Sequence, residues 1–175
     1  LERASLALKE KKFESEITPI MVTAKGNKEV VLEDEQPNKA NKKKIPFLKP
    51  AFNVGGSVTA ANSSSISDGA AAVVICDERS AKENGFQVRA RIVGYAGHAQ
   101  KANWFTTAPI FAVQKLLSKV GWSKDDVDLW EVNEAFAVVP MAFMRDMKIS
   151  QDRLNIRGGA CALGHPIGAS GTRIV

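Results

Sequence analysis

Cysteine is scarce in this sequence: Cys76 and Cys161 are the only two among 175 residues. Two cysteines do not form the disulfide framework of a small secreted domain, which favours a reducing compartment. The sequence also lacks any run of about 18 apolar residues, so we expect no transmembrane helix and no membrane partner. Its basic residues are not interleaved with aromatic ones and accompany no nucleic-acid-binding motif, so nucleic acid is not expected as a partner either.

What is present is typical of a globular protein. Hydrophobic residues make up 45% of the chain and charged residues 25%, a balance that argues against disorder and allows one domain with a core. The net charge is +5, and much of it lies in residues 37–50 (PNKANKKKIPFLKP). We favour a solvated linker there; the alternative is attraction of an anionic partner such as a phosphate-bearing small molecule.

Strands and helices are predicted to alternate from about residue 70 onward. The run AAAVVIC (70–76) predicts a buried strand, and further strands are expected at 87–99 and 126–133. A helix is expected at 108–121, with proline near its start and glycine after its end. The other expected elements are helices at 2–13, 78–85, 134–149 (interrupted by Pro140) and 164–175, a hairpin around KGNK (25–28), a loop at 36–53, and a strand or extended loop at 154–163. Apolar strands alternating with helices indicate an α/β fold with a mixed sheet covered by helices.

The stretch WEVNEAFA (130–137) is the first that suggests chemistry. An apolar strand is predicted to end at Asn133 and Glu134, and ligands of layered α/β folds bind at the ends of strands. Taken alone, Asn133 is better interpreted as a helix cap, and Glu134 as a charge facing a helix dipole. The alternative is that the Asn133 amide fixes a water or polarises a substrate oxygen.

The second such stretch is NIRGGACALGHPIGASGTRIV (155–175), in which glycines surround His165. Glycines at 158, 159 and 164 permit tight backbone turns and close approach to a ligand. Pro166 favours extended geometry at His165, which places this residue at a corner just ahead of a helix. The helix N-terminus would favour the neutral imidazole that a general base needs. A structural histidine in a tight turn is the alternative, and the surrounding glycines put function slightly ahead.

Together these motifs resemble the thiolase family. NEAFA and NIRGGACALGHPIGASGTRI are similar to its two C-terminal signature blocks, VTAANSSSISDGAAA (58–72) is similar to a third, and LKPAF and FTTAPIFA (105–112) also fit. The order and spacing agree along essentially the whole chain, and the GHPxGxSGxR block is very specific. The resemblance implies an α/β, thiolase-like layered fold that is incomplete here. Residues 1–56 are then the end of the loop region and linker, 57–80 the last strand segment of the N-terminal half, and 81–175 a truncated C-terminal half.

The resemblance, strongest to the biosynthetic type, also implies an activity. It implies a ping-pong acyltransferase that condenses two acetyl-CoA into acetoacetyl-CoA and CoA, or runs the reverse thiolysis. His165 would activate a nucleophilic cysteine, and Asn133 would hold a water that completes an oxyanion hole with the histidine. No metal and no cofactor is implied apart from the coenzyme A thioester substrate. The family implies homo-oligomers, dimers or tetramers.

The implied substrate-binding residues come from the other blocks. Ser64, in Asn62-Ser63-Ser64, matches the serine that contacts coenzyme A. Asn62 and Gly164 belong to the same substrate-binding set, and Phe105, where many relatives have methionine, should line the acyl pocket and influence chain length. The sequence departs from the family pattern at Arg157, Ser65 and Ser67, and a cation at position 157 would disturb the pocket or attract phosphates of coenzyme A.

Neither cysteine matches the two catalytic cysteines of the family, which are expected upstream of Leu1 and downstream of Val175. Cys76 is expected to be an inert core residue, and Cys161 is a poor nucleophile because nothing cationic except Arg157 is near it in sequence. The 175 residues alone are therefore expected to be inactive. The alternatives are a longer-chain 3-ketoacyl-CoA thiolase and a non-catalytic protein that binds coenzyme A. We expect a cytoplasmic location, with the mitochondrial matrix as the alternative.

Overall fold

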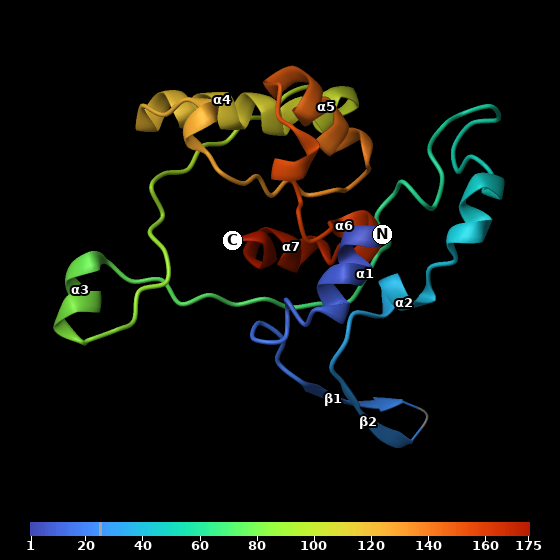
Figure 1. Cartoon of the computed structure of the whole chain (residues 1–175), viewed down its shortest axis with the longest axis horizontal. Coiled ribbons are helices and arrows are strands. Elements are labelled where there is room, and N and C mark those ends of the chain that lie inside the picture. The colour runs from blue at the N-terminus through green and yellow to red at the C-terminus, as the bar shows by residue number, and fades with distance from the viewer. Residues whose placement is uncertain (25) are drawn as a thin grey trace.

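The computed structural model describes residues 1–24 and 26–175 (Figure 1). In chain order its elements are α1 (Glu2–Lys9), β1 (Ile20–Ala24), β2 (Asn27–Val31), α2 (Glu35–Lys39), η1 (Lys42–Phe47), α3 (Glu78–Glu83), η2 (Ala102–Thr107), α4 (Ala108–Val120), η3 (Lys124–Asp126), α5 (Val138–Met147), η4 (Gln151–Arg153), α6 (Ala160–Leu163) and α7 (Ile167–Ile174), where η marks a 3-10 helix. Among the described residues, none of the helices combines the length and apolar character needed to cross a bilayer.

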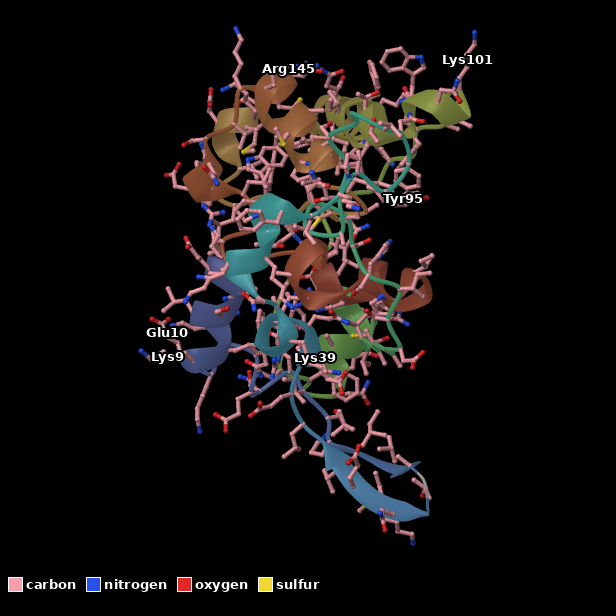
Figure 2. The ribbon with its side chains drawn as sticks, turned by 90° about the vertical axis from the view of Figure 1, so that its right-hand side faces the viewer. Lys9, Glu10, Lys39, Tyr95, Lys101 and Arg145 are labelled. Carbon is pink, nitrogen blue, oxygen red and sulfur yellow. The ribbon has the colours of Figure 1, made fainter. Side chains whose placement is uncertain are left out.

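The predicted hairpin is confirmed. Strands β1 and β2 pair antiparallel, with Ile20 opposite Val31 and Ala24 opposite Asn27. Gly26, with φ 82°, lies between the two strands; Lys25 of the expected KGNK turn lies outside the described residues. In two perpendicular views the hairpin projects away from the helices (Figure 1, Figure 2), so it takes no part in the site described below.

The main core lies between α4, α5 and the apolar segment that ends at Asn133. Phe143 of α5 is completely buried, and its ring centroid is 5.3 Å from that of Trp130. Trp130 also forms a parallel bridge with Leu154. Helix α4 has proline in its first turn and ends at Gly121 with φ 72°, as its sequence predicts. This core fixes the segment that carries Asn133 against the one that leads to His165.

A second, smaller core joins the N-terminus to the glycine-rich loop. Helix α1 forms where one was predicted, although it ends at Lys9, and its Ala4 and Ala7 pack near Leu163 of α6. Gly158 has φ +90°, and a Cβ there would lie 2.7 Å from the Ala4 Cβ. Glycine is therefore required at position 158 both for the turn and for the close approach of α1.

The predicted strands of the mixed sheet are not formed among the described residues. Residues 70–76 are unpaired and exposed, with Val74 97% exposed, and residues 87–99 are unpaired and mostly exposed. The segment 126–133 contributes only the bridge at Trp130. The prediction that Cys76 is a core residue is consequently wrong, since it is exposed. The physical reason is that a strand needs hydrogen-bonding neighbours, and the only extended sheet described here is the β1–β2 hairpin.

Two helical segments differ from the expected element bounds. The loop predicted at 36–53 contains most of α2 and the whole of η1. Pro140 does not interrupt its helix, because α5 begins at Val138 and the proline falls in the first turn, where no intrahelical N–H bond is lost. The later start of α5 matters for the site, because it removes Asn133 from the helix end.

Candidate active site

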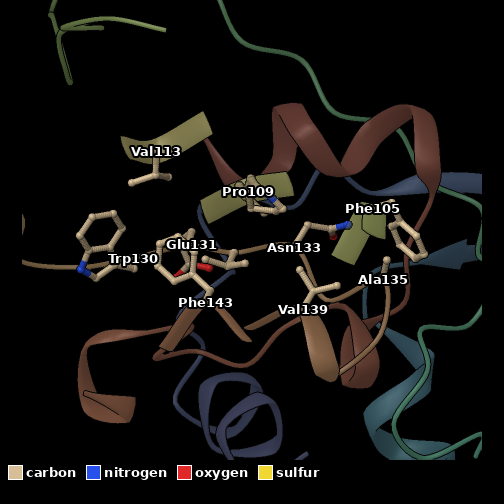
Figure 3. A pocket seen from close by; sticks show the side chains of 11 residues that line it. Phe105, Pro109, Val113, Trp130, Glu131, Asn133, Ala135, Val139 and Phe143 are labelled. Atoms are coloured by element: carbon tan, nitrogen blue, oxygen red, sulfur yellow. The ribbon is translucent and has the colours of Figure 1, made fainter. Parts of the chain in front are cut away.

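Asn133 is free of the capping role that its sequence position suggested. The residue that precedes α5 is Ala137, so four residues separate the helix from Asn133. Asn133 instead lines a largely apolar pocket of about 330 Å³. In Figure 3, Asn133 and Phe105 lie toward one end of this pocket, and Trp130 and Phe143 toward the other. The amide of Asn133 is thus a polar group at an apolar cavity, the usual composition of a small-molecule site.

His165 is placed by the tight turn that its neighbours predicted. Gly164 has φ +95°, a conformation that favours glycine, and a Cβ there would overlap the Ser67 side chain. The backbone N–H of His165 donates to the Ser65 carbonyl at 3.0 Å, within a parallel bridge between Ile66 and His165. Residues 58–72, which contain Ser65 and Ile66, therefore bond directly to the backbone of His165.

Both ring nitrogens of His165 have partners that indicate which tautomer the neutral imidazole adopts. Nδ1 lies 2.6 Å from the Ser170 Oγ, and this hydroxyl donates to the Pro166 carbonyl at 3.2 Å. The serine oxygen therefore accepts from Nδ1–H. Nε2 lies 3.3 Å from Asn133 Nδ2, an amide nitrogen that only donates. Nε2 consequently carries the lone pair, on the side of Asn133, which is the arrangement of a general base.

Ser64 and Asn62 lie beside the Asn133 segment. Both the N–H and the hydroxyl of Ser64 donate to the Ala135 carbonyl, at 3.1 and 2.9 Å. Asn62 accepts at its carbonyl from Ala137 N–H at 2.9 Å, and its side chain bonds backbone groups of Thr59 and Ser57. The hydroxyl of Ser64 keeps acceptor capacity for a ligand, whereas the Asn62 amide mainly shapes its own turn.

Phe105 forms part of the pocket wall from η2. It is 49% exposed, and its ring meets that of Phe136 edge to face with centroids 6.2 Å apart. Phe52 contacts the same Phe136 ring from another side at 6.3 Å. Of these three rings, only Phe105 lines the pocket together with Asn133, and Phe52 and Phe136 support it from outside.

The polar contacts of Arg157 are with the N-terminal segment. Its guanidinium lies 3.6 Å from the Glu16 carboxylate and 3.4 Å from the Lys12 carbonyl, both beyond the end of α1. The disturbance of the pocket considered from the sequence is therefore not seen in these contacts. Arg157 instead helps to hold the N-terminal segment against the glycine-rich loop.

Cys161 has the properties of an unreactive thiol. Burial and the neighbouring Glu134 carboxylate raise the pKa of its thiol to about 12. Its Sγ–H points to the Glu134 carbonyl at 3.5 Å. With such a pKa only about one thiol in ten thousand is ionised at pH 8, so Cys161 is a poor nucleophile, as the sequence had suggested.

The burial and the raised pKa of Cys161 predict that it reacts more slowly than the exposed Cys76. At pH 8, iodoacetamide should label the exposed Cys76 well before Cys161, and peptide mass spectrometry would give the order. The labelling rate of Cys161 should keep rising about tenfold per pH unit up to pH 11, because its thiolate fraction does so below the pKa. A rate that levels off below pH 10 would contradict the high pKa.

Sequence reasoning missed two contributors to the site. One is Ser170, which orients the His165 ring and whose hydroxyl, five residues after a corner histidine, is a signal that the sequence carries. The other is Asn155. It is only 3% exposed and donates its amide to the Glu134 carboxylate at 2.9 Å, a contact that no sequence pattern marks.

The chain is similar in sequence to known proteins along nearly its whole length. The chain is 47% identical over 172 residues to the acetyl-CoA acetyltransferase of Yarrowia lipolytica, covering 98% of this chain and 43% of that protein. It is 43% identical over 175 residues to the human mitochondrial acetyl-CoA acetyltransferase, covering 99% of this chain and 41% of that protein. The chain thus spans less than half the length of these relatives.

The solved structures give the fold. The acetyl-CoA acetyltransferase of Bacillus anthracis matches with a TM-score of 0.94 at 39% identity, and human mitochondrial 3-ketoacyl-CoA thiolase with 0.93 at 38%; each match covers 99% of this chain and 44% of the other. The described elements therefore have the thiolase fold, as predicted. Family models for the thiolase N-terminal domain and the thiolase C-terminal domain match residues 1–79 and 86–175. The chain belongs to the thiolase family.

Proposed function

We propose that the protein containing this chain is an acyltransferase that condenses two acetyl-CoA into acetoacetyl-CoA and CoA, or runs the reverse thiolysis. The observation that carries the proposal is the 3.3 Å contact between Asn133 Nδ2 and His165 Nε2 beside an apolar pocket. The relatives named acetyl-CoA acetyltransferase support the same activity. In this proposal His165 and Asn133 are catalytic, and Ser64, Asn62 and Gly164 line the path of coenzyme A.

In the first half-reaction, His165 Nε2 would take the proton of a cysteine thiol supplied from outside these 175 residues. The thiolate attacks the thioester carbonyl, the C–S bond to coenzyme A breaks, and a second cysteine protonates the departing CoA thiolate. His165 is then an imidazolium, and the second cysteine is a thiolate. The acyl group remains on the first cysteine.

In the second half-reaction, the second cysteine would remove an α-proton from another acetyl-CoA. The enolate oxygen is stabilised by the Nε2–H of His165 and by a water held on Asn133, two donors aimed where the negative charge develops. The enolate carbon attacks the acyl-cysteine, which forms the new C–C bond and releases the first cysteine as a thiolate. The proton on His165 then returns to that thiolate, and acetoacetyl-CoA leaves.

The proposal is tested by assaying thiolysis of acetoacetyl-CoA with the protein at its natural length. Turnover that is lost in Asn133→Ala, by about 10²–10³-fold for a removed oxyanion donor, would support it. Coenzyme A binding without any turnover would instead support the non-catalytic alternative. We also propose that the protein is a homo-oligomer and that the boundaries at 56 and 80 divide its parts. Its location stays a prediction of cytoplasm with the mitochondrial matrix as the alternative.

Chain-length preference should depend on Phe105. Replacing it by alanine removes a ring from the pocket wall, so the ratio of thiolysis rates on 3-ketohexadecanoyl-CoA and acetoacetyl-CoA should rise by about tenfold or more. Phe52→Ala is the matched control, because Phe52 contacts the same Phe136 ring without lining the pocket. A wild-type preference for the long chain would favour the 3-ketoacyl-CoA thiolase alternative, and an unchanged ratio in Phe105→Ala would refute the role of this ring.

A further inference from the structure

The Glu134 carboxylate lies between the two segments that carry Asn133 and His165. One of its oxygens, Oε1, accepts from Asn155 Nδ2 at 2.9 Å, and the other, Oε2, accepts from the backbone N–H of Cys161 at 3.2 Å. Glu134 follows Asn133 directly in the chain, and Cys161 lies four residues before His165. A single side chain thus connects the Asn133 segment to the loop that ends in the histidine.

Asn155 is held so that it can only donate to this carboxylate. Its Oδ1 accepts from Val132 N–H at 2.8 Å, and its Nδ2 donates to the Val132 carbonyl at 2.8 Å. These two backbone contacts prevent the amide from turning over. The residue is 3% exposed and has φ +46°, a backbone conformation that costs free energy and persists where surrounding contacts enforce it.

Gly159 makes room for the same carboxylate. A Cβ at position 159 would overlap the end of the Glu134 side chain, and its three nearest atoms all belong to that carboxylate. The φ of Gly159 is −148°, which any residue adopts. Space for Glu134, rather than backbone freedom, is therefore what requires a glycine here.

From these contacts we infer that Glu134 is a positioning residue, whose carboxylate sets the separation of Asn133 and His165 by binding Asn155 and the N–H of Cys161. This inference rests on the proposed function. Both partners are fixed donors, so two acceptor oxygens are needed at once. Glutamine at position 134 has the same shape but must direct an NH₂ group at one of the two donors, which breaks one contact.

The first test is steady-state kinetics of Glu134→Gln in the protein at its natural length. We expect kcat to fall by about 10–100-fold, because small displacements of catalytic groups are costly, while KM for the thioester changes less than about threefold. Glu83→Gln on the exposed face of α3 is the matched control and should leave both constants unchanged. A rise in KM as large as the fall in kcat, or an unchanged kcat, would overturn the inference.

A mutant cycle separates positioning from a general structural defect. Because Glu134 is inferred to act through Asn133, Glu134→Gln should cost less than about twofold in the Asn133→Ala background; an unreduced loss there would contradict the inference. Gly159→Ala is a second route to the same defect, because it displaces the carboxylate without changing it. Introduced alone, Gly159→Ala should lower kcat as much as Glu134→Gln does. Added to Glu134→Ala, it should lower kcat little further. If Glu134→Gln does not fold, Gly159→Ala replaces it in the kinetic test.

A third readout does not depend on activity. In histidine-labelled protein, the ¹⁵N shift of His165 Nε2 should change in Glu134→Gln, while His98, the other histidine of this chain, should keep its shifts as an internal control. If the wild type has no thiolase activity but His165 shifts, the proposed function fails and the inference stands. If Asn133→Ala abolishes activity and Glu134→Gln alters neither kcat nor the His165 shift, the inference fails and the function stands.

Discussion

Replacing His165 by alanine is expected to lower turnover in acetoacetyl-CoA thiolysis by about 10²–10⁴-fold, the contribution of a positioned general base. The lone pair on Nε2 faces Asn133, and Ser170 holds the opposite nitrogen, so the proton acceptor is already oriented in the free protein. In the proposed mechanism, the substitution removes the base of the first half-reaction and a donor to the enolate in the second. Single-turnover and steady-state rates of the natural-length protein would measure both losses.

Affinity distinguishes this role from a binding role. No contact described above uses the His165 ring to hold the Ser64 segment, so the dissociation constant of coenzyme A should change by less than about threefold. His98→Ala is the control, because His98 lies against Phe111 of α4, with ring centroids 4.8 Å apart, outside the residues that line the pocket. Equal losses of turnover and of affinity in His165→Ala would refute the assignment of a base.

Phe143→Ala is expected to have the largest effect on stability. This side chain is completely buried in the core that joins α4, α5 and Trp130. Truncating a buried phenylalanine loses its transfer free energy and leaves a cavity, which together lower the free energy of unfolding by about 3–5 kcal/mol. Urea unfolding of the natural-length protein, followed by tryptophan fluorescence, would report it because Trp130 contacts the ring.

The matched control for that substitution is Phe86→Ala. Phe86 is 56% exposed, so its truncation should change the free energy of unfolding by only about 0.5 kcal/mol. A loss in Phe143→Ala as small as that of the control would show that this core relaxes around the missing ring. Because Phe143 also borders the pocket, loss of stability should be accompanied by weaker acyl-group discrimination.

The sequence predicted helix α4 and the turn at His165 well, because their signals are local. Pro109 and Gly121 mark α4, and the glycine before His165 marks the turn at the start of α7. The meeting of Asn133 and His165 came from the family resemblance rather than from either motif alone, since each motif had a structural explanation of its own.

What the sequence could not predict depends on contacts between distant segments. The apolar run 70–76 indicates a preference for burial. Whether it forms a strand depends on neighbouring strands, which a local sequence pattern cannot predict. The helix expected from Glu134 begins instead at Val138, because the intervening residues are engaged by the segment around Ser64. The sequence position of Glu134 indicates a charge that faces a helix dipole, but its carboxylate accepts a hydrogen bond from Asn155 on the other segment of the site.

The segment around Ser64 has a consequence for local opening of the protein. It forms bridges on both sides, from Ser63 to Phe136 and from Ile66 to His165. The Asn133 segment and the His165 corner are therefore both bonded to the same four residues, 63–66, and we expect the two to open and close as one cooperative unit. Partial opening that keeps the histidine ordered while releasing the asparagine is disfavoured. The protein is thus expected to switch between an intact site and none, with no half-assembled form.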